Sequence, residues 1–505
     1  MPVFVGCDLG TMGTKAAVVD ESGAFLGEAF EEVPLHHPRP GQVEQDLLEI
    51  EASAHRTIAA ALEQSGRAAD VAGVAFSSQM SGIGTIDRSY EPATHFDSWL
   101  DTRCEPQIAR MTAEADRVSA LSGCPPTYAH GAKILWWREE RPDDYARIAR
   151  FVVPVAFVAG RLAGLSADEA YIDRTILHFS NLSDTAASRW SDELLDAFDL
   201  DDERLPRIVD PLDVIGHVTS AGAAVTGLPE GTPIAAGAGD QTAAALGAGV
   251  VEPGQAFDSA GTASVFAMCV DRFTPDIERR TLMATHGVVP GTFIALAFIN
   301  GGGLALRWYR DELMSGLDPD SAYRMLDGLA AKVPPGADGL LWLPHLQGRV
   351  LPPQPAARGA WVGLTSGHGH GHLFRAVLEG IAFEYATWAE HVRASGATVD
   401  SARALGGGAR SVVWNQIKAD VVGIDWVPTQ RQECGVLGDA LIAAVATGHI
   451  DDLAGTAKRW QQTSEPFVPD LNRHARYQGL LAAYRSLGEA LAPVFTRIAE
   501  ASSHQ

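Results

Sequence analysis

Cysteine is scarce in this chain, and no two cysteines form a paired motif. The 505 residues include five cysteines, which lie far apart in the sequence at Cys7, Cys104, Cys124, Cys269 and Cys434. An odd and scattered set argues against a disulfide framework and against a cysteine-based zinc site. We therefore expect reduced thiols, as in a cytoplasmic protein.

The chain also lacks a surplus of basic residues and lacks long apolar runs. Its 39 Lys and Arg residues stand against 63 Asp and Glu residues, which gives a formal net charge of −24. Because nucleic acids and anionic membrane surfaces attract clustered positive charge, we expect neither as a partner. No basic segment precedes the short apolar run at the N-terminus, so we expect no signal peptide. The most apolar later stretch, 151–165, contains Arg161 and is too short to span a bilayer.

Strand-like and helical patterns alternate along most of the sequence, which is typical of an α/β protein. A chain of 505 residues is too long for a single core. The segment 250–254, which contains Glu-Pro-Gly, is the expected seam between two domains, residues 1–250 and 251–505. The clearest helical patterns lie at 47–64, 373–392, 412–422, 436–447 and 473–499, the last with an expected break before Pro493.

The most informative pattern is a Gly-Thr turn between two apolar runs, because it occurs twice. The apolar run 3–7 leads into a turn whose candidate phosphate-binding residues are Gly10, Thr11, Thr14 and Lys15. In the second half, the run 255–258 leads into a turn that contains Gly261 and Thr262. Glycine lets backbone N–H groups approach an anion closely, and hydroxyl groups add donors. One such turn is commonly a plain hairpin, but two of them, each opening a half of the chain, predict a clamp for nucleotide phosphates.

Two aspartates follow predicted strands. Asp8 ends the first apolar run, where its carboxylate could support Mg²⁺ beside the phosphates or cap the turn. Asp240 follows the strand-like segment 232–237 and precedes an Ala-rich helix. Ligands of α/β sheets bind at such strand ends. Asp240 could therefore accept a proton from an attacking hydroxyl, or it could be a simple helix N-cap.

A glycine cluster follows the strand-like segment 402–405 and opens a helix. Its residues are Gly406, Gly407, Gly408 and Ala409. Backbone N–H groups at a helix N-terminus favour anions, and glycine leaves space for a base or a ribose. The dinucleotide spacing G-x-G-x-x-G fails, because Ser411 takes the place of the third glycine.

Two further loops contain candidate ligand-binding side chains. Trp99, Asp101 and Arg103 offer a ring face with donors and acceptors that suit a polyol. The alternative is a buried tryptophan beside a surface ion pair. Three histidines alternate with glycine at 368–372, but a flexible loop supplies no fixed coordination geometry, so we expect no metal role there.

Taken together, these residues resemble the FGGY family of carbohydrate kinases, within the superfamily of actin, hexokinase and the heat-shock chaperone ATPases. Residues 8–15 are similar to the first phosphate loop, 261–262 to the second, and 406–410 to the adenosine motif. Residues 359–364 and 372–379 resemble the C-terminal family signature, which is the most specific match. Residues 237–241 are similar to the segment that contains the catalytic aspartate.

The resemblance implies a fold and an activity. It implies two ribonuclease-H-like domains, as in actin-like ATPases, with the active cleft between them. It implies transfer of a phosphoryl group from ATP to a sugar or polyol hydroxyl, with Asp8 supporting Mg²⁺ and Asp240 as the base. The acceptor-binding residues that it implies are Gln79, Met80, Trp99, Asp101, Arg103, Asp240 and Gln241. The resemblance leaves open whether the protein forms a homodimer.

Several sugar-reading positions depart from the pattern of xylulokinases. Ser81 replaces the usual His, and Leu100 and Gln241 each replace an Asn. The N-terminal family signature around 133–136 is only partial, because His130 occupies a slot where Pro, Ser or Thr is usual. We therefore expect a ketopentose such as xylulose, with ribulose, erythritol, glycerol and gluconate as alternatives.

A non-catalytic sugar sensor is the rival from another class, but it would have no use for a base at Asp240. A chaperone-like ATPase would need a peptide-binding β-domain, and we expect no room for one after Glu500.

Overall fold

The computed structural model describes residues 1–261, 263–316 and 318–502, so Thr262 of the second turn lies outside the described residues. The chain forms two compact units built from interleaved segments. Unit 1 comprises residues 1–252, 271–294 and 433–461, and unit 2 comprises residues 253–270, 295–432 and 462–505. Each unit contains a mixed sheet with flanking helices, which confirms the predicted α/β class.

The sheet of unit 1 has the strand order β13-β14-β5-β1-β2-β3. β1 pairs antiparallel with β2 and parallel with β5, so it lies at the centre of the sheet. The short β15 pairs with the end of β5. These strands are β1 (Val3–Leu9), β2 (Gly13–Asp20), β3 (Phe25–Glu32), β5 (Val71–Ser78), β13 (Val214–His217), β14 (Pro233–Ala235) and β15 (Ala238–Gly239).

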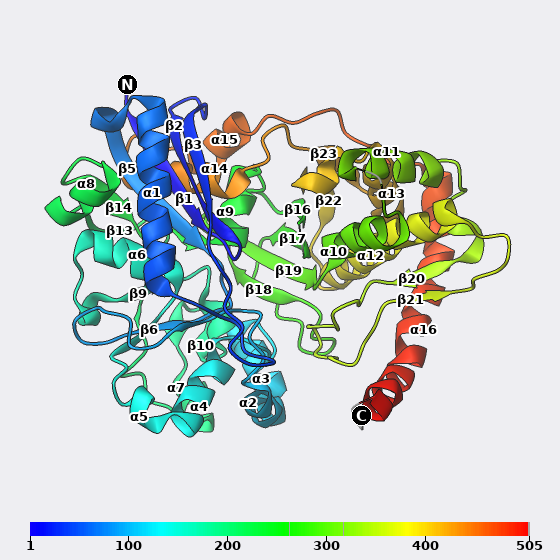
Figure 1. Ribbon diagram of the computed structural model, residues 1–505, viewed down its shortest axis with the longest axis horizontal. Coiled ribbons are helices and arrows are strands. Elements are labelled where there is room, and N and C mark those ends of the chain that lie inside the picture. The colour runs from blue at the N-terminus through cyan, green and yellow to red at the C-terminus, as the bar shows by residue number, and fades with distance from the viewer. Residues whose placement is uncertain (262, 317, 503–505) are drawn as a thin grey trace. The chain divides into compact units, whose positions relative to one another are not determined.

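Two helices cover opposite faces of this sheet, because side chains of β1 alternate between the faces. Phe4 belongs to the core formed with α14 (Cys434–Ala446). At Gly6, on the same face, an added Cβ would lie 2.1 Å from a backbone oxygen of α14, so only glycine allows this approach. Cys7 points to the other face, toward α1 (Leu47–Ser65). Figure 1 shows α1 running across the strands of this sheet.

The other elements of unit 1 connect and cover these layers. Its helices are α2 (Glu105–Met111), α3 (Ala115–Ser122), α4 (His130–Glu140), α5 (Pro142–Tyr145), α6 (Pro154–Ala163), α7 (Asp192–Ala197), α8 (Ser220–Thr226), α9 (Asp240–Gly247) and α15 (Leu453–Trp460). Its short strands are β4 (Glu44–Gln45), β6 (Gly84–Ile86), β7 (Phe96–Asp97), β8 (Arg150–Val152), β9 (Tyr171–Asp173), β10 (Ser183–Asp184), β11 (Arg189–Trp190), β12 (Arg207–Val209) and β18 (Met283–His286).

Unit 2 repeats the central arrangement of unit 1. Its strands follow the order β19-β17-β16-β22-β23, in which β16 pairs antiparallel with β17 and parallel with β22. Each predicted Gly-Thr motif therefore lies between two antiparallel strands, which confirms the strands predicted on both sides of each motif. The strands are β16 (Gly254–Ala260), β17 (Ser264–Val270), β19 (Phe293–Ile299), β22 (Val399–Leu405) and β23 (Asp425–Pro428).

The helices of unit 2 correct two expectations. α16 continues through Pro493, so the predicted break is wrong; this proline is exposed, and one missing N–H does not end a long helix that is packed elsewhere. His370 and His372 belong to the first turn of α12 and not to a loop. The elements are α10 (Gly302–Trp308), α11 (Pro319–Ala330), α12 (His370–Ala394), α13 (Val412–Val422), α16 (Leu471–Ser502), β20 (Leu341–Leu343) and β21 (Ala360–Val362).

An ion pair lies in the core of unit 2. Lys418 of α13 and Asp258 of β16 are both fully buried, and the lysine ammonium contacts the carboxylate. The Tyr385 hydroxyl donates to Asp258 Oδ1 over 2.7 Å, and Lys418 Nζ lies 3.5 Å from the centre of the Trp414 ring. The pair therefore ties the strand that leads into the second turn to the helix that follows the glycine cluster.

No helix in the described part of the chain combines the length and the apolar character that a bilayer crossing requires.

Candidate active site

Asp8 lies at the end of the central strand of unit 1, between Lys15 of β2 and Ser77 of β5. Its side chain is half-buried, and the Ser77 hydroxyl lies 3.3 Å from Oδ1. Burial raises the pKa of Asp8 to about 6, although Lys15 and Ser77 act in the opposite direction. Gly435 of α14 leaves room beside this carboxylate, since an added Cβ there would lie 3.3 Å from Oδ2.

The side chains of Thr14 and Lys15 are engaged within unit 1. Thr14 is fully buried, and its hydroxyl lies 2.6 Å from Ser53 Oγ of α1. Lys15 Nζ pairs with Glu433 at 2.5 Å, on a partly exposed surface. In this structure both side chains therefore hold β2 in place, and neither points freely into the first turn.

Thr11 at the tip of the first turn is tied to the predicted acceptor loops. The indole N–H of Trp99 donates to Thr11 Oγ1 over 2.8 Å. The Gln45 side-chain amide donates to the Thr11 carbonyl over 3.1 Å, and Gln45 in turn accepts a 2.8 Å hydrogen bond from the amide of Gln79. Gly10 closes the turn by donating its N–H to Gly13 O. Segments that are distant in the sequence thus form one hydrogen-bonded cluster around the turn.

Asp240 opens α9 directly after β15, which pairs with the end of β5. The preceding residue, Gly239, is held by a 2.9 Å hydrogen bond from its N–H to Thr175 Oγ1. Burial raises the pKa of Asp240 to about 7, and the nearby charge of Asp8 adds to this shift. A carboxylate whose pKa lies near neutrality is suited to accept a proton at physiological pH.

Met80 packs against Gly239, the residue before Asp240, and Gln241 follows Asp240 in α9. An added Cβ at Gly239 would lie 2.5 Å from Met80 Cε, which shows how closely Met80 packs against Gly239. The side-chain oxygens of Gln79 and Gln241 are buried and have no hydrogen-bond partner among the described residues. Buried acceptors of this kind cost free energy until a donor reaches them, so both can accept from a ligand hydroxyl.

Asp101 and Arg103 are paired with each other. Asp101 is fully buried, and its Oδ2 accepts a 2.7 Å hydrogen bond from the Val43 N–H. Arg103 Nε lies 2.9 Å from both Asp101 oxygens, and its Nη2 donates to Glu44 over 2.6 Å. The ion pair that the sequence left as an alternative is therefore present, and it is buried.

Sequence reasoning missed the supporting role of α4. His130 lies with Nε2 2.8 Å from the Met80 carbonyl, and Lys133 donates to the Asp101 carbonyl over 3.1 Å. Both side chains are buried, and burial lowers the pKa of His130 to about 4, so the ring is neutral. The partial family signature at 133–136 pointed to this helix, but a lysine in sequence is ordinarily read as exposed.

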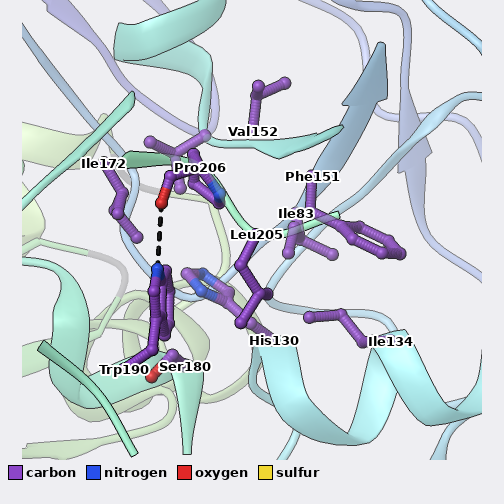
Figure 2. Close-up of a pocket in the computed structure, with 11 residues that line it drawn as sticks. Ile83, His130, Ile134, Phe151, Val152, Ile172, Ser180, Trp190, Leu205 and Pro206 are labelled. Carbon is purple, nitrogen blue, oxygen red and sulfur yellow. Dashed lines mark hydrogen bonds between the residues drawn. The ribbon is translucent and has the colours of Figure 1, made fainter. Parts of the chain in front are cut away.

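A small cavity in unit 1 is lined by His130, Trp190 and mainly apolar side chains (Figure 2). Trp190 donates its indole N–H to the Pro206 carbonyl over 3.0 Å across the lining. The cavity volume is about 10 Å³, which is room for one water at most. This cavity is therefore too small to be a sugar site.

Unit 2 contains a much larger cavity of about 740 Å³. Gly407 and Gly408 of the predicted adenosine motif line it, together with Gly261 of the second turn. Ligand pockets of a few hundred cubic ångströms bind molecules of nucleoside size. The remaining lining residues combine apolar and charged side chains: Ala260, Gly303, Leu306, Arg307, Asp320, Tyr323, Arg324, Asp327, Phe374, Leu378, Arg410, Ser411 and Trp414.

Substitution of Gly303 by Ala is expected to weaken nucleotide binding in this cavity. An added Cβ at Gly303 would lie 1.6 Å from Gly261 O, so the second turn must move. Overpacking of this kind costs about 1–3 kcal/mol, which predicts a rise of roughly 5- to 150-fold in the KM for ATP. The control is Gly328→Ala in α11, where an added Cβ meets nothing within 4 Å. Equal KM values for the two variants would contradict this prediction.

Together, the fold and the site define a carbohydrate kinase. Residues 3–247 match the model for the N-terminal domain of the FGGY family of carbohydrate kinases, and residues 256–447 match the model for its C-terminal domain. The chain belongs to this family, whose members are phosphotransferases that act on sugars and related alcohols.

Relatives with several substrates resemble the chain over its whole length. It is 27% identical over 502 residues to a xylulose kinase of Bacillus subtilis, with 96% of this chain and 97% of that protein covered. It is also 27% identical over 515 residues to a gluconokinase of the same organism, with 98% of each chain covered. The crystal structure of a xylulose kinase from Rhodospirillum rubrum matches with a TM-score of 0.89 and 28% identity, covering 97% of this chain and 99% of that one.

Proposed function

We propose that this kinase transfers the γ-phosphoryl group of ATP to a hydroxyl of a ketopentose such as xylulose, with Asp240 as the general base. The observation that carries the proposal is the half-buried Asp240 carboxylate at the start of α9, with a pKa of about 7. Met80 packs against the preceding Gly239, and the buried oxygens of Gln79 and Gln241 have no hydrogen-bond partner among the described residues. Because the pKa of Asp240 lies near neutrality, its ionised form is available at physiological pH and can orient the acceptor hydroxyl and take its proton.

In this proposal, each unit contains its own residues for nucleotide binding. In unit 2, the cavity lined by Gly407 and Gly408 binds the adenosine, with Gly406 and Ala409 shaping the same turn. In unit 2, the Gly261 turn donates backbone N–H groups to phosphate oxygens. In unit 1, the Gly10–Thr11 turn is a phosphate site of the same kind, in which the N–H of Gly10 is already bonded to Gly13 O. Thr14 and Lys15 support the first turn through β2.

Asp8 is the residue of unit 1 that suits Mg²⁺. Among the described residues, no three His, Cys, Asp or Glu side chains converge on a common metal position. Magnesium in nucleotide sites keeps several waters and uses one or two carboxylates together with the phosphates. A single half-buried carboxylate therefore fits the ion, which would neutralise charge on the phosphates.

The catalytic work of the protein in this reaction is positioning and charge neutralisation. Asp240 orients the acceptor hydroxyl and accepts its proton as the oxygen attacks. Gln79 and Gln241 accept hydrogen bonds from neighbouring hydroxyls, and Met80 packs against the carbon chain. The buried pair of Asp101 and Arg103 shapes the loop from which Trp99 presents its ring.

The acceptor assignment is tested by ADP release from MgATP across D-xylulose, D-ribulose, L-ribulose, erythritol, glycerol and gluconate. The wild type should give its highest kcat/KM with a ketopentose. Loss of a side chain that organises hydroxyl recognition should lower that value in Asp101→Ala and compress the preference among sugars. A highest kcat/KM for glycerol or gluconate, or an unchanged preference order in Asp101→Ala, would overturn this assignment.

The pH profile tests Asp240 separately. Because the proposed base works only when deprotonated and its pKa is about 7, activity should be full above that pH and fall as the carboxylate takes a proton. We expect kcat/KM for the sugar to decline about tenfold per pH unit below the pKa, since each unit lowers the ionised fraction tenfold. A profile that stays flat down to the ordinary aspartate pKa would show that Asp240 is not the base.

A further inference from the structure

A third aspartate, Asp439, is buried behind Asp8 in unit 1. It is the single charged residue of α14, whose sequence is otherwise small and apolar. The helix packs tightly at this point: an added Cβ at Gly438 would lie 2.0 Å from the Ala243 carbonyl oxygen. Asp439 itself is fully buried. Burial of a carboxyl group in a site without water costs free energy, whereas burial of an apolar side chain there would not.

Asp439 lacks the partners that an ionised carboxylate requires. Its Oδ2 lies 2.8 Å from the Ser77 hydroxyl, and its Oδ1 has no hydrogen-bond partner among the described residues. No Lys, Arg or His in the described part of the chain forms an ion pair with it; the nearest charges are the carboxylates of Asp8 and Asp240. An unpaired buried charge costs several kcal/mol, so the neutral acid is the stable form.

The hydrogen atoms at Ser77 require a proton on one of two carboxyl groups, and the unpartnered Oδ1 of Asp439 assigns it to Asp439. Ser77 is fully buried between two carboxyl groups, 2.8 Å from Asp439 Oδ2 and 3.3 Å from Asp8 Oδ1. A serine hydroxyl has one hydrogen and cannot donate to both. Both contacts become hydrogen bonds when Asp439 holds a proton and donates it to Ser77 Oγ, which then donates its own hydrogen to Asp8.

We propose that Asp439 is a permanently protonated acid that, through Ser77, orients the carboxylate of Asp8. It is a positioning residue, because it reaches the site only through Ser77. The hydrogen-bond relay Asp439–Ser77–Asp8 fixes Oδ1 of Asp8 and leaves Oδ2 on the side of Gly435. No proton leaves this hydrogen-bond relay during the reaction. Burial and the two neighbouring carboxylates raise the pKa of Asp439 well above its usual range, in line with this assignment.

The protonated state is tested on the free protein by infrared difference spectroscopy of the wild type against Asp439→Asn. The measurement is made about one pH unit above the pKa of Asp240, which is about 7, so that Asp240 is mainly ionised. The wild type should show the carbonyl stretch of a carboxylic acid, shifted in D₂O, and Asp439→Asn should lack it. The control, Asp240→Asn, should retain the band. Absence of the band from the wild type would overturn the proposal.

The positioning role is tested by binding of Mn²⁺ in the presence of ADP, followed by electron paramagnetic resonance. Asn keeps a neutral donor, so Asp439→Asn should bind Mn²⁺ within about threefold of the wild type. Asp439→Ala and Ser77→Ala interrupt the hydrogen-bond relay to Asp8. These variants should bind Mn²⁺ roughly 10- to 100-fold more weakly, as for other groups that orient metal ligands. Thermal unfolding of each variant establishes that it is folded.

The outcomes separate this inference from the proposed function on which its metal role rests. If Asp8→Asn weakens Mn²⁺ binding but Asp439→Ala and Ser77→Ala do not, the positioning role is wrong and the role of Asp8 stands. If Asp439→Asn binds as weakly as Asp439→Ala, Asp439 acts as a charged ligand and the proposal is overturned. If Asp8→Asn leaves Mn²⁺ binding unchanged, the proposed magnesium role of Asp8 fails, and the positioning role fails with it.

Discussion

Replacement of Asp240 by Asn should lower kcat for sugar phosphorylation by roughly two to four decades, the range that a positioned general base contributes. The amide has nearly the same shape and cannot take a proton from the acceptor hydroxyl. The fold should survive, because the backbone here is held from Gly239 to Thr175 and not by the Asp240 side chain. The measurement is the initial rate of ADP formation at saturating sugar and MgATP.

The matched control is Asp46→Asn. Asp46 is the exposed N-cap of α1, and Asn caps a helix about as well as Asp, so the same chemical change there should leave kcat unchanged. An unaltered affinity for ADP would show that the loss in Asp240→Asn belongs to the chemical step. If a folded Asp240→Asn variant turns over within about threefold of the wild type, the base lies elsewhere.

Lys418→Met should lower the free energy of unfolding by about 3–5 kcal/mol, the usual loss when one partner of a buried ion pair is removed. The substitution leaves the Asp258 carboxylate buried, with the Tyr385 hydroxyl as its remaining hydrogen-bond donor among the contacts described above. It also removes the ammonium group that lies over the Trp414 ring. Urea-induced unfolding of the whole protein, followed by tryptophan fluorescence, measures this loss.

The double variant Asp258→Asn/Lys418→Met separates charge from packing. With both charges removed, most of the lost stability should return, since no uncompensated charge stays buried. Lys332→Met, at an exposed position of the same unit, should change stability by less than about 0.5 kcal/mol. If Lys418→Met is no more harmful than Lys332→Met, the buried pair does not stabilise the unit.

Local patterns in the sequence predicted the elements that carry the site. The apolar runs on either side of the Gly-Thr turns became the hairpins β1–β2 and β16–β17, because short β-type runs around a tight turn are specified by neighbouring residues. The helix expected at 47–64 formed as α1, with Asp46 as its N-cap and Gly66 in the left-handed conformation at its C-terminus. These signals act over a few residues.

Contacts between distant segments escaped prediction. Thr14 follows a Gly-Thr turn, yet its hydroxyl faces Ser53 because strand alternation turns this side chain into the core. Lys15 pairs with Glu433, a residue more than 400 positions away, which no local pattern encodes. Asp439 had one visible signal, an isolated acid in an apolar helix, but its burial beside Ser77 depends on α14 joining unit 1.

The most direct test of the central claim is a ³¹P nuclear magnetic resonance experiment with D-xylulose and MgATP. If this protein is a ketopentose kinase with Asp240 as its base, the wild type converts the γ-phosphate signal of ATP into a phosphomonoester signal of the sugar, with little free phosphate. Asp240→Asn should give almost none of this product over the same time. Release of free phosphate without a sugar phosphomonoester, or equal product from both proteins, would contradict the account.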